Sequence, residues 1–408
     1  MRLLPTLFFA VLVPSLASQG VVSPVHVGNP AAVPGLSAPA VPWVSSVDVR
    51  FVHLAGDPPN VYYTTATVTG LSAVAGGAGG LDVACGRYDV LTDTFVPNND
   101  AAALNTPGHE RDLSLHASGL SGVYIDSQSR IVLVSRATLA QPWQVVGPIA
   151  LLCPCGSGNP FRAALADYRG QPQLIVNRFD TLVMGPIDLA TGTMLGPDVT
   201  IVAGSLTARP DWPVPITDPS GEILGVSHSM VFGAAVADID HYVSLDLDPN
   251  TPPLPLHDAA VQAYAGGVAG GRFVDGEWTS ATGTRLVAID RIWTTGGRAP
   301  VGGTMVVRVF SPPTPGPELY LSALAASTGF LAVGQPMPPL LGLVGIDLAS
   351  AWITTPAVHD NRNGEARVGL TVPNAPALSG TRLPVQCVTL EVTSGTFYLG
   401  NTAVVAVD

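Results

Sequence analysis

The sequence predicts an all-β protein built around a repeated unit of about fifty residues. Glycine (44) and proline (38) are abundant and separate short runs of Val, Ile, Leu and Thr, a pattern typical of turns joining short strands. All 18 basic residues are Arg and only six acidic residues are Glu, so the residues that favour long helices are scarce. Hydrophobic residues make up 47% of the chain, which is enough to fill a sizeable core.

Regularly spaced glycines mark the repeat. Their spacings are 49, 51, 51 and 55 residues, and a period near 50 is typical of the four-stranded blades of a β-propeller. We therefore expect a β-propeller of about five blades over residues 46–310. Each glycine is expected in the first hairpin of its blade, after the innermost strand. The five glycines are Gly70, Gly119, Gly170, Gly221 and Gly276.

The second repeat shows the expected strands most clearly. We predict an inner strand at 113–117, a hairpin at Gly119, two further strands at 123–126 and 131–135, and an outer strand at 143–148. A second recurring feature is Asp-x-x-Thr, which we interpret as the turn between the two outer strands because Asp accepts hydrogen bonds from the backbone just ahead of it. This pattern starts at Asp89, Asp188 and Asp248.

The second repeat also resembles a known family. The segment from Arg111-Asp112-Leu113-Ser114 to Gly119, then Val123-Tyr124-Ile125 and 131–137, is similar to a TolB-type propeller blade that ends in Pro142-Trp143. The resemblance covers this blade well and the other four loosely. It implies the fold and no single function.

The N-terminal segment has the features of an export signal. Arg2 gives a positive start, residues 3–13 are mostly apolar, and Ser15-Leu16-Ala17 fits a cleavage site. We expect residues 1–18 to be a signal peptide and the protein to be secreted or extracytoplasmic, in the periplasm or on the cell surface. Residues 19–45 are rich in proline and are expected to be extended.

The residues after the repeats predict a small antiparallel β-sandwich at 319–408. A proline-rich linker at 311–318 precedes it, and Asn361-Arg362-Asn363-Gly364 is a candidate hairpin turn. The segment resembles the C-terminal β-domains appended to many exported bacterial proteins. Its alternating or apolar runs lie at 319–324, 340–346, 366–372, 385–392 and 403–407.

Charge and cysteine content limit the partners. A net charge of −12 disfavours nucleic acid and anionic lipid, and no later segment is long and apolar enough for a membrane span after signal removal. The sequence shows no cofactor motif and no metal-binding spacing, so we expect neither cofactor nor metal. The cysteines are expected to form disulfides or buried thiols, with their pairing left open. They are Cys85, Cys153, Cys155 and Cys387.

The repeat register sorts the candidate site residues between the two ends of the propeller channel. Glu222 and Glu277 follow repeat glycines and are expected at the hairpin end, away from the usual ligand face. Three acids near inner-strand starts are the candidate catalytic carboxylates: Glu110, Asp112 and Asp211. Candidate binding residues at the same mouth are His109, Arg111, Asp126, Arg162, Asn177, Arg178 and His228.

The predicted architecture resembles glycoside hydrolase families 32 and 43, which use carboxylates from several blades. Glu110-Arg111-Asp112 is similar to the Arg-Asp-Pro motif of family 32, although Leu113 replaces the proline, and Gly56–Asn60 is a weaker echo of its Asn-Asp-Pro-Asn motif. No Glu stands at the start of the third or fourth inner strand, where a general acid would be sought. A structural interpretation of Glu110 and Asp112 is a strand cap, or pairing between blades with Arg111 or Arg162.

These observations favour an exported propeller with a binding or surface-structural role and no enzymatic activity. Its expected partner is a glycan or another envelope or extracellular protein. The alternative is a glycan-active hydrolase that uses carboxylates at the channel mouth.

Overall fold

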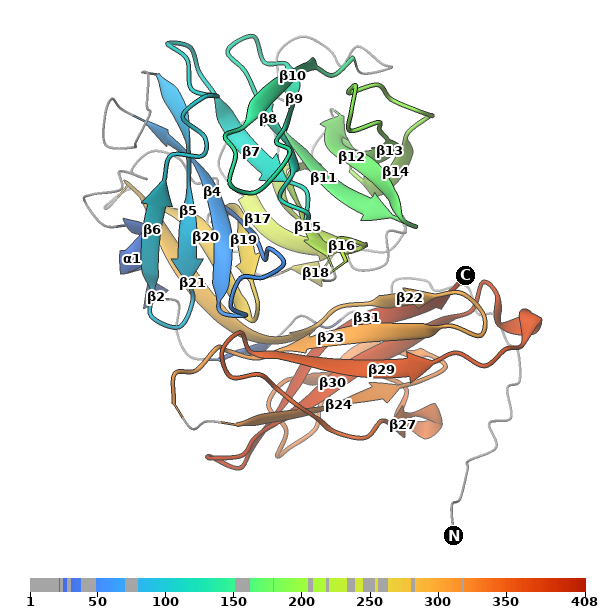
Figure 1. Cartoon of the computed structure of the whole chain (residues 1–408). Coiled ribbons are helices and arrows are strands. Elements are labelled where there is room, and N and C mark those ends of the chain that lie inside the picture. Colours follow the sequence, from blue (N-terminus) through green and yellow to red (C-terminus); the bar gives the residue numbers. More distant parts are fainter. Residues whose placement is uncertain are drawn as a thin grey trace.

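The chain folds into two β-rich bodies (Figure 1). The repeat body holds residues 49–294, and the C-terminal body holds residues 297–408. The predicted signal peptide, Gly70, Cys153, Cys155 and Asp248 lie outside the described residues. The computed structural model describes residues 22, 25–27, 31–37, 49–69, 80–150, 162–178, 180–204, 208–217, 220–232, 239–244, 254–255, 263–279, 283–316 and 319–408.

Four antiparallel four-stranded sheets follow one another along the repeat body, each with its strands in sequence order. The first sheet is β3 (Val49–Val52), β4 (Val61–Thr69), β5 (Leu81–Asp89) and β6 (Thr94–Asn98). The second is β7 (Arg111–Leu115), β8 (Ser121–Ile125), β9 (Ile131–Ser135) and β10 (Gln144–Pro148). The third is β11 (Ala163–Tyr168), β12 (Gln171–Arg178), β13 (Thr181–Pro186) and β14 (Val199–Ala203). The fourth is β15 (Ala208–Thr217), β16 (Ile223–Phe232), β17 (Ile239–Ser244) and β18 (Leu254–Pro255).

A fifth sheet combines the two ends of the repeat region. Its strands β19 (Ala263–Ala269), β20 (Arg272–Thr279) and β21 (Gly283–Thr294) are joined at the edge by β1 (Val25–His26) and β2 (Ala31–Ala32). The short helix α1 (Pro34–Ser37) follows β2. The segment predicted to be extended and proline-rich therefore supplies edge strands to the last sheet.

Apolar clusters join neighbouring sheets of the repeat body. The first and second sheets pack through a cluster that includes Tyr63 and Leu113, and similar clusters join the second to the third and the third to the fourth. A further cluster joins the first sheet to the fifth and includes Val49, Val274 and Leu36 of α1. Strand β3 also lies against β19, so the last sheet packs on the first.

The predicted strands of the second repeat are confirmed, with ends shifted by one or two residues. Gly119, Gly170 and Gly221 follow the first strand of their sheets and have φ of 66°, 69° and 97°, a region that favours glycine. Asp89 and Asp188 begin turns, as predicted, and accept hydrogen bonds from the backbone N–H two residues ahead.

The predicted register is wrong in the outer repeats. Gly276 lies inside β20 opposite Leu286, and the first hairpin of the fifth sheet is at Gly270 and Gly271 instead. In the first sheet the corresponding hairpin is at residues 53–60, well before Gly70. A glycine within a strand carries the same sequence signal as a hairpin glycine, which is why the spacing alone misassigned Gly276.

The C-terminal body is built from two strand pairs and one larger sheet, and its main core lies between one of these pairs and the larger sheet (Figure 1). Strand β23 (Thr304–Phe310) pairs with β29 (Glu365–Thr371), and β25 (Phe330–Pro336) pairs with β26 (Leu343–Ile346). The larger sheet contains β22 (Gly297–Ala299), β31 (Thr396–Val407), β30 (Arg382–Glu391), β24 (Tyr320–Ala326), β27 (Trp352–Ile353) and β28 (Ala357–Val358). Two short 3-10 turns, Leu348–Ser350 and Pro376–Leu378, complete it.

Strands β22 and β23 fall in the region that the sequence assigned to the repeats, yet they pair with strands of the C-terminal body. The predicted linker therefore joins β23 to β24 within this body, and Ser311 donates its backbone N–H to the carbonyl of Gly364. Strand β21 runs from the fifth sheet into the C-terminal body and pairs with β23 at Trp293 and Thr294. Residues 361–364 form the predicted turn, with Gly364 at φ 69°.

The turn at 361–364 is anchored by the buried His359. Its Nδ1 lies 2.8 Å from the carbonyl oxygen of Gly364, and its Nε2 lies 2.6 Å from the hydroxyl of Ser322. A carbonyl can only accept, so Nδ1 carries the proton and Nε2 accepts from Ser322. Burial lowers the pKa of His359 to about 4, despite the raising effects of the Gly364 carbonyl and Glu365.

This depressed pKa predicts a loss of stability in acid. The stabilising contribution is fully present above the unfolded pKa near 6.5 and is lost as the pH falls towards about 4. The free energy of unfolding in urea should fall by about 3 kcal/mol more in the wild type than in His359→Gln between pH 7.5 and pH 4. The same change at the exposed His109 is the control, and equal pH slopes for wild type and His359→Gln would contradict the prediction.

Candidate functional site

Five residues meet at the end of the repeat body where β7, β11 and β15 begin, and we call them the mouth cluster. Arg162 Nη1 lies 2.7 Å from Asp112 Oδ2, and the Arg162 guanidinium stacks 4.9 Å from the centre of the Trp212 ring. The backbone N–H of Arg162 donates to Asn177 Oδ1, and Asn177 Nδ2 donates to Asp211 Oδ1 at 2.9 Å. The structure therefore brings together four residues that the sequence singled out, together with Trp212.

Two matching backbone irregularities build the mouth cluster. Asp112 and Trp212 both have positive φ, 60° and 48°, and both lie where the pairing register of β7 or β15 shifts. Such bulges redirect a side chain out of the regular alternation of a strand. The place of Trp212 in this cluster could not be predicted, because a positive φ at tryptophan has no sequence signal.

The candidate carboxylates are held in structural contacts. Glu110 is buried and accepts hydrogen bonds from the backbone N–H and the hydroxyl of Thr106. Asp112 is also buried and pairs with Arg162, with Arg111 further away at 3.8 Å. Glu110 therefore caps the segment before β7, and Asp112 joins the second and third sheets.

The remaining predicted residues lie apart from the mouth cluster. Asp126 closes the β8–β9 turn by pairing with Arg130, and Arg178 pairs with Asp198. His228 was expected near the end of the second strand, in a loop, but it lies within β16 and is fully buried. The exposed His109 accepts a hydrogen bond from the backbone N–H of Leu81.

The two glutamates assigned to the hairpin end have different positions. Glu222 is at that end, where it accepts a hydrogen bond from the backbone N–H of Gly170. Glu277 is not: it lies in β20 opposite Ala263, the first residue of β19, and therefore at the end from which the first strand starts. The misplaced register of Gly276 caused this error.

Arg50 lies between the mouth cluster and the interior of the repeat body. It is buried on β3, and its Nη1 donates to the carbonyls of Ala163 at 3.3 Å and Pro213 at 3.0 Å. These carbonyls belong to residues directly after Arg162 and Trp212. One arginine from the first sheet thus contacts the third and fourth sheets. No sequence pattern predicts these contacts.

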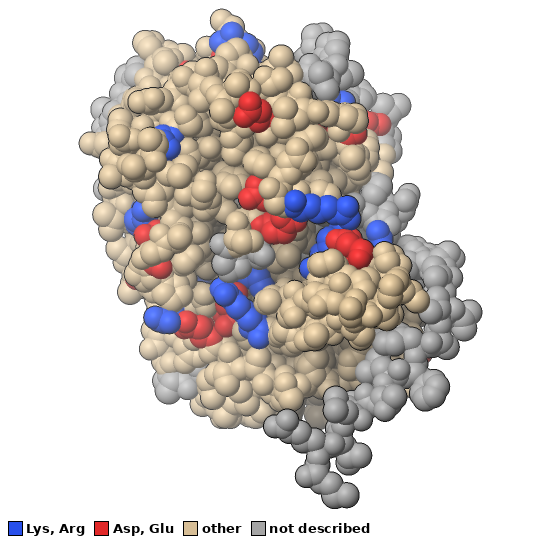
Figure 2. Space-filling view, turned by 45° about the vertical axis from the view of Figure 1, so that its right-hand side comes forward, with Lys and Arg blue, Asp and Glu red and all other residues tan. Residues whose placement is uncertain are grey.

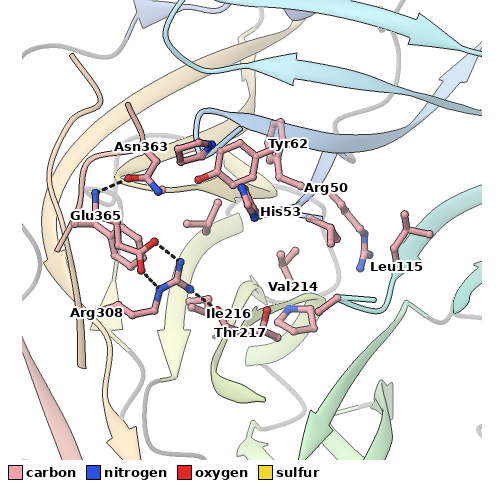
Figure 3. Close-up of a pocket in the computed structure, with 18 of the residues that line it drawn as sticks. Arg50, His53, Tyr62, Leu115, Val214, Ile216, Thr217, Arg308, Asn363 and Glu365 are labelled. Carbon is pink, nitrogen blue, oxygen red and sulfur yellow. Dashed lines mark hydrogen bonds and ion pairs between the residues drawn. The ribbon is translucent and has the colours of Figure 1, made fainter. Parts of the chain in front are cut away.

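Below Arg50 is a cavity of about 190 Å³ between the repeat body and the C-terminal body (Figure 3). The first strands of the five sheets contribute Arg50, Ser114, Leu165, Val214 and Val268 to its wall. The C-terminal body contributes Arg308, Phe310, Asn363, Glu365 and Arg367, and the fifth sheet adds Trp293.

An ion pair forms the floor of this cavity (Figure 3). Arg308 binds Glu365 through two hydrogen bonds of 3.0 and 2.9 Å, and its third nitrogen donates to the carbonyl of Thr217 in the repeat body. Burial alone would raise the pKa of Glu365, but Arg308 and Arg367 bring it below its usual range. Glu365 therefore stays ionised, and Arg308 ties the two bodies together.

Charged side chains of both signs lie near the middle of the face shown in Figure 2. Burial raises the pKa of the free thiols of Cys85 and Cys387 to about 12, so both are protonated and unreactive. Across the described ranges, no group of three metal-ligating side chains occurs, and no helix has the length and hydropathy of a membrane span.

No protein family model and no curated protein matches this chain. The similar solved structures are β-propeller proteins. GH43B of the xyloglucan PUL of Bacteroides ovatus is 9% identical, with 88% of this chain and 90% of that chain covered and a TM-score of 0.39. The GH43 protein BlXynB of Bacillus licheniformis is 8% identical over 92% and 91%, with a TM-score of 0.37. The Cps50 (Swd1) β-propeller domain of Myceliophteria thermophila is 8% identical over 88% and 96%, with a TM-score of 0.28.

The buried ion pair of the mouth cluster gives a stability prediction. Arg162→Gln leaves the buried Asp112 carboxylate without its 2.7 Å partner and should lower the free energy of unfolding by about 3 to 5 kcal/mol. Adding Asp112→Asn to this variant should recover part of the loss. In urea titrations, Arg130→Gln at the exposed Asp126 pair is the control and should cost less than about 1 kcal/mol. Equal losses in the two single variants would contradict a structural role for the Arg162 pair.

Proposed function

We propose that this chain is an exported five-bladed β-propeller with a C-terminal β-sandwich, and that it binds a carbohydrate at its mouth cluster without catalysing a reaction. The blade count is supported by five successive sheets, with the fifth packed on the first. The sandwich is supported by the two strand sets that enclose the core of the C-terminal body.

The observation that carries the non-enzymatic role is the engagement of the candidate carboxylates. A glycosidase needs one carboxyl group as acid and another as base or nucleophile, both facing the scissile bond. Here Asp112 pairs with Arg162, Glu110 caps Thr106, and Asp211 accepts from Asn177. Each of these contacts holds its carboxylate against another residue of the chain, and not toward the position of a scissile bond.

Carbohydrate binding is supported by the chemistry of the mouth cluster. A half-buried indole ring lies beside guanidinium, carboxylate and carboxamide groups. Such a set offers a flat apolar face for the C–H groups of a sugar and hydrogen-bonding groups for its hydroxyls. Export is supported by the positive, apolar and small-residue pattern of residues 1–18, which would place the protein among extracellular glycans.

A glycan array followed by a turnover assay tests this function. We expect binding of at least one oligosaccharide without release of new reducing ends. Trp212→Ala should weaken that binding by about tenfold, the size expected for a central aromatic contact. Trp352→Ala, a half-buried tryptophan of the C-terminal body, is the matched control and should leave affinity unchanged. Release of reducing ends that disappears in Asp112→Asn would instead establish the hydrolase alternative.

A further inference from the structure

Polar side chains of both bodies line the cavity between them. Within the described part of the chain, three of these side chains have a polar group that makes no hydrogen bond to the protein and is not fully buried. They are the hydroxyl of Tyr62, the amide nitrogen of Asn363 and the hydroxyl of Ser114, and their residues are 6%, 8% and 3% exposed. Groups of this kind are available to a ligand that enters the cavity.

Tyr62 and Asn363 lie side by side at Gly270 (Figure 3). A Cβ on Gly270 would lie 2.2 Å from the carbonyl oxygen of Asn363 and 3.2 Å from the Tyr62 hydroxyl, so only glycine permits this approach. Burial raises the pKa of Tyr62, and the nearby Arg308 and Glu365 act in opposite directions. The hydroxyl therefore keeps its proton and remains a hydrogen-bond donor.

The orientation of the Asn363 side chain is fixed by its neighbour. Its Oδ1 accepts a hydrogen bond of 3.0 Å from the backbone N–H of Glu365, which assigns oxygen and nitrogen without ambiguity. The Nδ2 group must then be directed away from the Glu365 backbone, and it donates to no described residue. It lies in the part of the cavity wall that also contains the Tyr62 hydroxyl.

Ser114 and the aromatic residues complete the wall. Ser114 comes from β7, on a different sheet from Tyr62. Trp293 and Phe310 stack on each other at 4.6 Å, and aliphatic side chains from the inner strands cover much of the remaining wall. The cavity thus combines apolar surface with a few hydrogen-bonding groups, as small-molecule sites do.

We infer that this cavity is a binding site for a small polyhydroxylated molecule no larger than a single sugar ring. Its volume of about 190 Å³ is below the roughly 300–1,000 Å³ of sites for drug-sized ligands, which sets the upper limit on size. The Tyr62 hydroxyl and Asn363 Nδ2 donate to ligand oxygens, and the Ser114 hydroxyl can donate or accept. Bound hydroxyl groups would pair with the three cavity-lining groups that make no hydrogen bond to the protein.

This site is independent of the mouth cluster and of the proposed function. Arg50 lies between the two, with its Nη1 bonded to the carbonyls of Ala163 and Pro213, and no residue of the mouth cluster lines the cavity. A glycan bound at the mouth would be sensitive to Trp212→Ala, whereas a molecule in the cavity would be sensitive to Tyr62→Phe. A negative result for one proposal therefore does not decide the other.

Isothermal titration calorimetry and thermal unfolding of the full chain test the inference. The probes are glycerol, xylose, glucose, galactose and glucuronate, the last to separate charged from neutral ligands. We expect at least one probe to bind and to raise Tm. Tyr62→Phe and Ser114→Ala should each weaken that probe by about tenfold, the equivalent of one lost hydrogen bond. In the absence of probe, Tyr62→Phe should have an unchanged or higher Tm, because the Tyr62 hydroxyl makes no hydrogen bond to the protein.

Tyr398→Phe is the matched control, since it removes a hydroxyl that pairs with Glu391 elsewhere in the C-terminal body. It should leave probe affinity unchanged. The inference is overturned if no probe shows heat or a Tm shift up to about 10 mM, which is beyond the weak end of specific binding. It is also overturned if Tyr62→Phe binds the probe as tightly as the wild type.

Discussion

The structure depends on covering both faces of every sheet in the repeat body. Neighbouring sheets pack through apolar clusters, which remove their side chains from water. An open row would leave one face of the first and of the last sheet exposed, and the cluster that contains Val49 and Val274 covers them. The edge strands β1 and β2 reinforce this contact, because they bring the N-terminal part of the chain onto the last sheet.

The packed sheets of the repeat body have two ends, and polar side chains lie at both. The contacts of these side chains differ between the two ends. At one end the mouth cluster pairs acids with Arg162 and Asn177. At the other end the C-terminal body covers the opening, and Arg308 bonds both Glu365 and the Thr217 carbonyl. At the first end the charged and amide groups contact one another, whereas at the second the Tyr62 hydroxyl and Asn363 Nδ2 line the cavity without a hydrogen bond to the protein, which is why we assign a small ligand to it.

The sequence predicted what depends on local signals. The strands of the second repeat, the turns at Asp89 and Asp188, and the 361–364 turn all follow from nearby residues. The contacts of Arg50 and Arg308 could not be predicted, because their partners lie far along the chain: Arg50 and Pro213 are 163 residues apart, and Arg308 and Thr217 are 91 apart. Arg162 and Asp112 meet at one end of the repeat body because Arg162 directly precedes β11 and Asp112 is the second residue of β7.

A crystal structure of the protein grown with a monosaccharide that raises its Tm tests the central claim most directly. The account predicts density for one sugar ring in the cavity, with its oxygens within hydrogen-bond distance of the Tyr62 hydroxyl and Asn363 Nδ2, and an intact Asp112–Arg162 pair. Density for the sugar only beside Asp112, with the Arg162 contact broken and the cavity empty, would contradict the account.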